Sequence, residues 1–145
     1  MIEITFKIIS HNTPEYFAAV NLREDILRKP LGLAFAPDEF DKEKDHIQIA
    51  GFQDDEVVAT AVLVSKGMCI YKMQRVAVKS DLANTGVGSK MMAFCENHAR
   101  ALGAKSVYCH ARDSAVSFYL KNGYIAEGNY FIETTIVHLK MIKAL

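Results

Sequence analysis

Residues 74–92 read QRVAVKSDLANTGVGSKMM, and this stretch decides the fold. It opens with the apolar, largely β-branched run 76–78, which is typical of a strand end. A polar turn follows, and Gly86 and Gly88 then begin an amphipathic helix that we expect to reach Leu102. A strand, a turn and a helix start suit an anion, because the first N–H groups of a helix have no partner within it.

The two glycines add to this prediction. Neither Gly86 nor Gly88 has a Cβ, so a diphosphate can come within hydrogen-bond reach of the backbone. By itself a G-x-G before a helix fits a tight turn with close helix–strand packing equally well. Two better-known phosphate motifs are excluded: Met91 stands where a Rossmann motif needs its third glycine, and no Gly-Lys-Ser/Thr completes a P-loop.

A second motif follows the expected strand at residues 106–111. It reads A-x-x-F-Y-x-x-x-G-Y from Ala115 to Tyr124. Together with R-V-A-V at 75–78 and the G-x-G, it resembles the GNAT (Gcn5-related) N-acetyltransferase superfamily, over about residues 47–141. The closing run 131–141 is similar to the F-x-E-x-G-I-x-H-x-x-M ending of a small-substrate subgroup of the ElaA/YjcF type, with Thr135 in place of the glycine.

The resemblance implies an α/β fold with a mixed sheet. Residues 47–78 are expected to form an antiparallel meander, and the resemblance implies that its last strand then runs parallel to, and splays away from, the strand at 106–111. The sequence pattern itself predicts alternating strands and capped helices. The strands are expected at 1–9, 46–52, 56–64, 68–78, 106–111, 124–127 and 135–141, and the helices at about 13–28, 38–43, 86–102 and 114–122.

Size and composition favour one globular domain over residues 1–145. Half of the residues are apolar, and 17 basic residues balance 17 acidic ones. This balance argues against nucleic acid as a partner, and no apolar stretch is long enough for a membrane span. Cys69, Cys95 and Cys109 form no C-x-x-C pair, which indicates free thiols and a cytoplasmic location. The scattered histidines predict no metal site.

Acetyl-CoA is the cofactor that the resemblance implies. The turn and helix start would hold its diphosphate by backbone N–H groups. The strand end would pair with the pantetheine, with the N–H of Val78 polarising the acetyl oxygen. Ala83 stands where the family usually has Gln or Arg, so we expect somewhat weaker cofactor binding. The implied cofactor-binding residues are Val76, Ala77, Val78, Asn84, Thr85, Gly86, Val87, Gly88, Ser89, Ala115 and Phe118.

Tyr119 occupies the family's catalytic tyrosine position and is the expected general acid. A phenol is more weakly acidic than a thiol, so it is protonated when the thiolate departs. The candidates for the general base that removes the proton from the amine are His110, His138, Glu133 and a water chain, and the sequence does not choose between them. Cys109 and His110 are adjacent in a strand and point to opposite faces, which favours direct transfer over an acetyl-cysteine intermediate.

The acceptor is expected to be a small primary amine. In the resembled family the region of residues 23–45 walls the acceptor site, and Arg23 and Arg28 are candidate substrate-binding residues, or else a solvated basic face. A homodimer is left open. Two alternatives to an acetyltransferase are left open: a CoA-binding or regulatory module without turnover, and a nucleotide-binding domain of another class.

Overall fold

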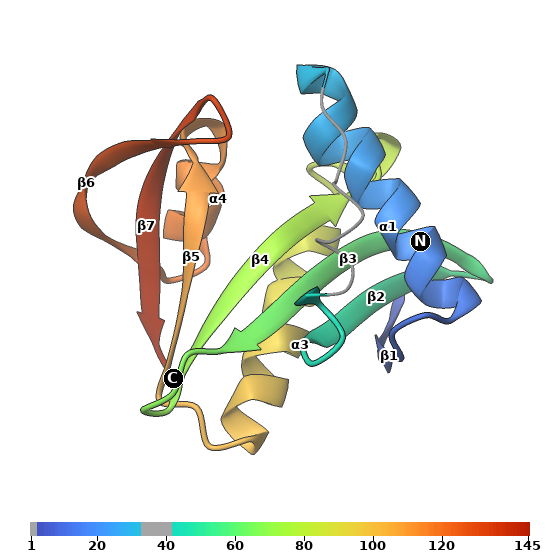
Figure 1. The fold of residues 1–145 in the computed structure, drawn as a ribbon, viewed down its shortest axis with the longest axis horizontal. Helices are drawn as coiled ribbons and strands as arrows, with labels where there is room; N and C mark the ends of the chain where they lie inside the picture. The colour runs from blue at the N-terminus through green and yellow to red at the C-terminus, as the bar shows by residue number, and fades with distance from the viewer. Residues whose placement is uncertain (1–2, 33–41) are drawn as a thin grey trace.

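The computed structural model describes residues 3–32 and 42–145. A seven-stranded mixed sheet in the order β1-β2-β3-β4-β5-β7-β6 forms its centre (Figure 1). The strands are β1 Thr5–Ile9, β2 Ile47–Gln53, β3 Glu56–Ser65, β4 Ile70–Val78, β5 Ser106–Arg112, β6 Ile125–Glu133 and β7 Ile136–Ala144. The α-helices are α1 Pro14–Arg23, α3 Val87–Ala101 and α4 Val116–Lys121.

The predicted α/β architecture is confirmed. Strands β1 to β4 form an antiparallel meander, and β4 pairs with β5 in the parallel direction. Figure 1 shows α1 crossing one face of the meander and α3 lying behind the other. The apolar side of α3 is buried in the core through Met91, Met92, Cys95 and Ala99.

The first helix departs from its predicted form. It begins as expected, with the Thr13 side chain accepting from the N–H of Tyr16, but its α-helical part ends at Arg23. A π-helical turn η1, Glu24–Arg28, and a 3₁₀ turn η2, Lys29–Leu31, follow. Pro30 fits the start of a 3₁₀ turn, where its missing N–H costs nothing, so the chain continues past it. Most of the predicted helix at 38–43 lies outside the described residues.

The last hairpin is longer than predicted. We expected strands at 124–127 and 135–141, whereas β6 reaches Glu133 and β7 reaches Ala144. The β6–β7 pairing is irregular between Glu127 and Phe131, where the register shifts. Pairing resumes beyond it because β7 continues alongside, and the hairpin turn falls at Thr134 and Thr135, both with positive φ.

The parallel pair opens partway along its length. Strands β4 and β5 pair only between residues 70–72 and 106–108. Beyond this point β4 contains a bulge opposite β3, at which Arg75 has a φ of 52°. A bulge bends its strand and increases the local twist, so the remaining residues of β4 turn away from β5. The expected splay is therefore present.

Within the part of the chain that the structure describes, no helix has both the length and the apolar character to cross a membrane.

Candidate active site

Two cavities, each of about 410 Å³, meet where β4 and β5 separate. We call the first the β4–β5 cavity; it is lined by residues of β4 and β5, the end of η1 and the β6–β7 turn. We call the second the α3 groove; it is lined by the end of β4, the start of α3 and one side of α4. Val76, Ala115 and Tyr119 line both cavities, so the two spaces adjoin at the splay.

The α3 groove contains most of the residues predicted to bind the cofactor. They are Val76, Ala77, Val78, Asn84, Gly86, Gly88, Ser89, Ala115 and Phe118. The side chains of the remaining two lie elsewhere. The Thr85 hydroxyl donates to the carbonyl of Leu82, and Val87 is buried in the core.

Glycine is required at positions 86 and 88 for different structural reasons. Gly86 caps α3 at a φ of 90°, a conformation that other residues rarely adopt. A Cβ on Gly88 would lie 3.1 Å from two ring carbons of Phe118, so the bare backbone allows the ring to approach. No side chain of the described residues caps the first turn of α3. The start of this helix therefore offers N–H groups to a ligand in the groove.

Tyr119 lies at the junction of the cavities, with only 6% of its surface exposed. Burial raises its pKa well above the ordinary value for tyrosine, and hydrogen bonding to Cys109 adds to this effect. The hydroxyl therefore carries its proton at any ordinary working pH. Burial likewise raises the pKa of Cys109 to about 12, which keeps the thiol protonated.

The cysteine environment gives a testable prediction. Burial also raises the pKa of Cys95 to about 12, whereas Cys69 is exposed. Because alkylation requires an accessible thiolate, iodoacetamide at pH 8 should modify the native chain at Cys69 alone. Peptide mass mapping would check this, with urea-unfolded protein labelled at all three sites as control. Rapid native labelling of Cys109 would reopen the acetyl-cysteine route.

The sheet register brings the predicted base candidates onto one face. His138 lies opposite Arg112 on β5 and opposite Phe131 on β6, and His110 lies two residues before Arg112. Because side chains alternate along a strand, His110, Arg112 and His138 share a face that borders the β4–β5 cavity. The ring of Phe131 packs between the two imidazoles, edge-to-face with His110 and stacked with His138.

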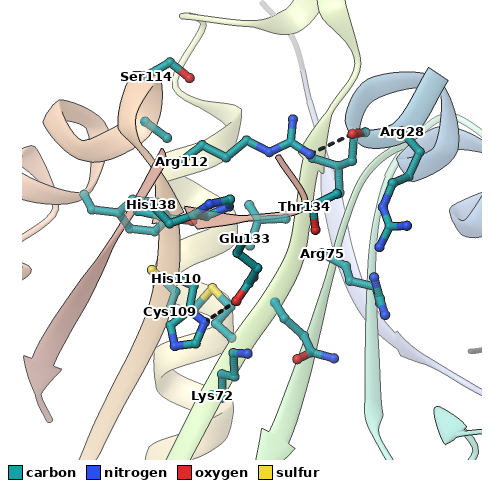
Figure 2. Close-up of a pocket in the computed structure, with 17 residues that line it drawn as sticks. Arg28, Lys72, Arg75, Cys109, His110, Arg112, Ser114, Glu133, Thr134 and His138 are labelled. Atoms are coloured by element: carbon teal, nitrogen blue, oxygen red, sulfur yellow. Dashed lines mark hydrogen bonds and ion pairs between the residues drawn. The ribbon is translucent and has the colours of Figure 1, made fainter. Parts of the chain in front are cut away.

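Hydrogen bonds fix the orientation of both histidines. His110 Nδ1 lies 2.9 Å from a carboxylate oxygen of Glu133 (Figure 2). His138 Nδ1 lies 2.8 Å from the carbonyl oxygen of Ile136. Both partners accept hydrogen bonds, so each Nδ1 carries the hydrogen and each Nε2 keeps the lone pair of the neutral ring.

Several cavity residues were not foreseen in the sequence. Lys72 and Gln74 reach the β4–β5 cavity from β4, and Arg112 reaches it from β5. Arg112 also donates from Nη2 to the carbonyl of Leu27, at 2.7 Å, which ties the end of η1 to β5. Arg112 could have been expected in the cavity, because side chains alternate along a strand and Arg112 lies two residues after His110. Lys72 had no such signal, because the bulge in β4 interrupts the alternation.

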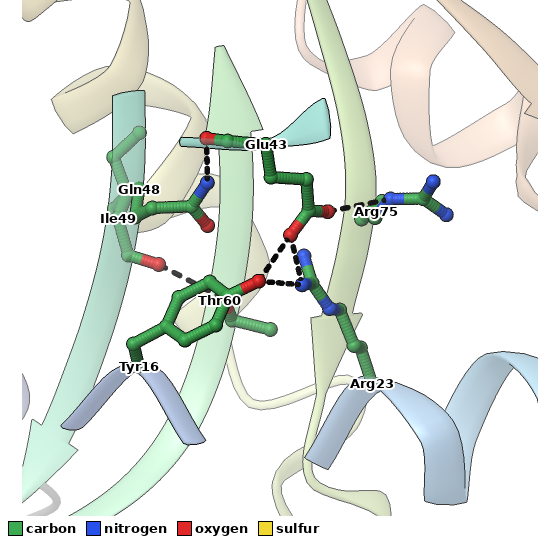
Figure 3. A network of polar contacts seen from close by, with 7 residues as sticks. All are labelled: Tyr16, Arg23, Glu43, Gln48, Ile49, Thr60 and Arg75. Atoms are coloured by element: carbon green, nitrogen blue, oxygen red, sulfur yellow. Dashed lines mark hydrogen bonds and ion pairs between the residues drawn. The ribbon is translucent and has the colours of Figure 1, made fainter. Parts of the chain in front are cut away.

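The two predicted substrate-binding arginines lie in different places. Arg28 lines the β4–β5 cavity. Arg23 is 1% exposed and lines neither cavity. Figure 3 shows Tyr16, Arg23 and Arg75 converging on the carboxylate of Glu43. Tyr16 Oη donates to Glu43 at 2.7 Å, Arg23 Nη2 lies 2.5 Å from the same oxygen, and Arg75 Nε lies 2.9 Å from the other.

The chain is similar in sequence and in fold to known proteins. The sequence model of the acetyltransferase (GNAT) domain matches residues 34–145. The chain superposes on Escherichia coli ElaA with a TM-score of 0.83 and 21% identity, covering 97% of this chain and 99% of that one. A GNAT family acetyltransferase from Elizabethkingia anophelis, solved with acetyl-CoA bound, gives a TM-score of 0.76 and 14% identity, with 98% of both chains covered.

Among curated proteins, a relative matches part of the chain. It is the tRNA(Met) cytidine acetyltransferase TmcA of Aeropyrum pernix, 36% identical over 59 residues, which are 40% of this chain. The match covers only 8% of the length of that relative.

Proposed function

Because the chain belongs to the GNAT acetyltransferase family, whose model matches residues 34–145, we propose that it transfers an acetyl group from acetyl-CoA to a primary amine of a small molecule. The observation that carries the proposal is the position of Tyr119, whose side chain lines both cavities at the β4–β5 splay. One cavity offers a helix start for a phosphate, and the other has histidines that can accept a proton. A donor and an acceptor bound on the two sides would meet beside this hydroxyl.

The α3 groove fits the cofactor that the family implies. Asn84, Gly86, Gly88 and Ser89 would hold its diphosphate at the uncapped helix start, and the end of β4 would pair with its pantetheine. Phe118 and Ala115 would pack against it. The bound cofactor supplies an acetyl thioester. The acetyl-CoA held by the Elizabethkingia anophelis relative supports the same choice here.

The transfer is proposed to be direct. The amine nitrogen forms a bond to the acetyl carbon, and the carbon–sulfur bond breaks. The backbone N–H of Val78 would donate to the acetyl oxygen as negative charge develops on it. Tyr119 Oη would give its proton to the departing sulfur. The protonated thiol of Cys109 is a poor nucleophile, which supports direct transfer.

We assign proton removal from the amine to His110, with Glu133 as its positioning residue. The carboxylate orients the ring and stabilises the imidazolium that forms after proton transfer. The His110 side chain is 27% exposed, so it can return the proton to solvent. His138 is the second candidate, but its Nδ1 partner is a neutral carbonyl that gives less stabilisation to a charged ring.

The proposed function is tested by supplying a panel of primary amines with acetyl-CoA and detecting thiol release with a thiol dye. Release that depends on one or more amines, with the acetylated product seen by mass spectrometry, is the expected result. Tight CoA binding in calorimetry without transfer to any amine would instead favour the CoA-binding or regulatory module. Protection against thermal unfolding by ATP or NAD, but not by CoA, would favour a nucleotide-binding domain of another class.

Gly88→Leu is expected to weaken CoA binding by roughly tenfold or more, the loss of one or two hydrogen bonds to a charged group. Its Cβ would already crowd the ring of Phe118, and the rest of the side chain would block the helix start. Calorimetry with CoA measures the effect. Ala93→Leu, an exposed position on the same helix, is the matched control and should bind CoA normally. Equal affinity in both variants would contradict the assignment of the groove.

His110→Gln should lower kcat by about 10²-fold, the lower end for a general base, because water can accept part of the proton flux. His138→Gln should change kcat less. Steady-state kinetics of the two variants with the same amine make the comparison. The reverse pattern would move the base to His138.

A further inference from the structure

The wall that η1 forms along the β4–β5 cavity has little buried surface of its own. Its last two residues, Leu27 and Arg28, line the cavity. The segment packs against α1 and β4, but none of residues 24–28 is fully buried. A segment with few buried contacts opens at a low cost in free energy. The position of this wall therefore depends on the further contacts that η1 makes.

Arg112 supplies such a contact from the opposite wall. It is the last residue of β5, and its Nη2 donates to the carbonyl of Leu27 at 2.7 Å. We call this hydrogen bond the η1–β5 tie. Pro30 has no N–H, so it cannot donate the i+3 hydrogen bond that a 3₁₀ turn would otherwise offer to this carbonyl.

The η1–β5 tie is expected to be a strong hydrogen bond. Its donor is a guanidinium, and charged donors form stronger hydrogen bonds than neutral ones. Burial lowers the pKa of Arg112, which shows that the guanidinium is partly withdrawn from water. A hydrogen bond in such surroundings is stronger than one that competes with bulk water. One bond of this kind can hold the end of η1 against β5.

The tie closes one end of the cavity. Leu27, Arg28 and Arg112 all belong to the cavity lining. Figure 2 shows the Arg112 side chain extended from β5 towards η1, at the end of the cavity away from Lys72. His110 lies two residues before Arg112 on the same face of β5, a separation of about 7 Å along a strand. For an acceptor whose nitrogen lies beside His110, the tie is a near boundary.

We propose that Arg112, through the η1–β5 tie, limits the size of the amine that the β4–β5 cavity accepts, so that compact primary amines are acetylated in preference to bulkier ones. This inference rests on the proposed function, because it names a specificity-determining residue of the same site. The cavity, of about 410 Å³, is towards the small end of the range for ligand sites. Movement of η1 away from β5 would widen it.

Hydrogen exchange followed by mass spectrometry tests the tie without any turnover. Arg112→Met keeps an unbranched side chain and removes the donor. Peptides that cover residues 24–31 should then exchange roughly tenfold faster than in the parent, the effect of losing a hydrogen bond from a charged group. Arg100→Gln removes a charge from the exposed surface of α3 and should leave this exchange unchanged. Exchange at the parent rate in Arg112→Met would overturn the tie as an anchor of η1.

Size selectivity is measured with amines of equal charge. Benzylamine is compared with 4-phenylbenzylamine, which is longer, and with 1-naphthylmethylamine, which is broader, each supplied with acetyl-CoA. The parent should favour benzylamine. Arg112→Met should raise the bulky-to-compact ratio of kcat/KM by roughly tenfold in at least one pair, the usual discrimination by pocket shape, and mainly through a lower KM for the bulkier amine.

Arg100→Gln is again the control and should keep the parent ratio. A parent that favours the bulkier amines would overturn the proposal. So would a ratio that is the same in Arg112→Met as in the parent, because a residue that only supports the fold would change kcat/KM for all amines alike.

Calorimetry separates failure of this inference from failure of the proposed function. N-benzylacetamide and its 4-phenyl and naphthyl counterparts are titrated into the CoA-saturated protein. Tighter binding of a bulkier amide to Arg112→Met than to the parent supports the size limit even if no amine is acetylated. Acetylation of amines with the same size preference in the parent and in Arg112→Met would leave the proposed function standing and remove the size limit.

Discussion

Replacing Tyr119 with phenylalanine is expected to lower kcat by roughly 10²–10⁴-fold, the usual contribution of a general acid, with little change in CoA affinity. The ring and its packing are retained, so the loss would come from the proton that the hydroxyl gives to the departing sulfur. Steady-state kinetics with a saturating amine, together with calorimetry of CoA binding, measure the two quantities separately.

Tyr124→Phe is the matched control for this experiment. Tyr124 is also a buried tyrosine, its hydroxyl donates to Glu96 at 2.8 Å, and it lines neither cavity. Its replacement should reduce stability and leave kcat nearly unchanged. A Tyr119→Phe enzyme with the kcat of the parent would remove Tyr119 from the mechanism.

The pH dependence provides a second check on the same residue. Burial raises the folded-state pKa of Tyr119 well above the ordinary tyrosine value near 10. A group with a raised pKa stays protonated as the pH passes its ordinary value. The kcat of the parent should therefore show no loss attributable to tyrosine ionisation up to about pH 10. A fall in kcat near pH 10 that is absent in Tyr119→Phe would show that the hydroxyl titrates like an ordinary tyrosine.

The second large effect is expected in stability. Glu43→Ala should lower the free energy of unfolding by about 3–5 kcal/mol, the typical cost of removing one partner of a buried ion pair. Glu43 is 2% exposed and receives contacts from Tyr16, Arg23 and Arg75. Without the carboxylate, the buried guanidinium of Arg23 loses a buried ion pair. Urea unfolding followed by circular dichroism measures the change.

Glu127→Ala is the control for the stability experiment. Its partner Lys140 lies 2.8 Å away, but both side chains are substantially exposed to solvent. Exposed pairs contribute little, so the loss should be within about 1 kcal/mol. Comparable losses in Glu43→Ala and Glu127→Ala would show that the buried network contributes no more to stability than an exposed pair.

Much of the scaffold was predictable because its signals are local. The N-cap at Thr13 and the glycine start of α3 each depend on a few consecutive residues. The end of β4 and the start of α3 are close along the chain, so their shared groove was local as well, whereas Ala115 and Phe118 were assigned to it only through the family resemblance. The extra length of β6 was missed, because its pairing depends on β7 and not on its own composition.

The sequence by itself determined the strand–turn–helix unit around Gly86 and Gly88 and, through the spacing of two motifs, the family. Only the tertiary structure decided which polar side chains share the β4–β5 cavity. His110 and Glu133 are brought together by the register in which β5 pairs with β7 and β7 pairs with β6. Arg23 binds Glu43, twenty residues further along the chain, and therefore lies outside the cavity. Such contacts depend on which strands pair and where a bulge bends them. Interactions between residues that are close in sequence determine neither.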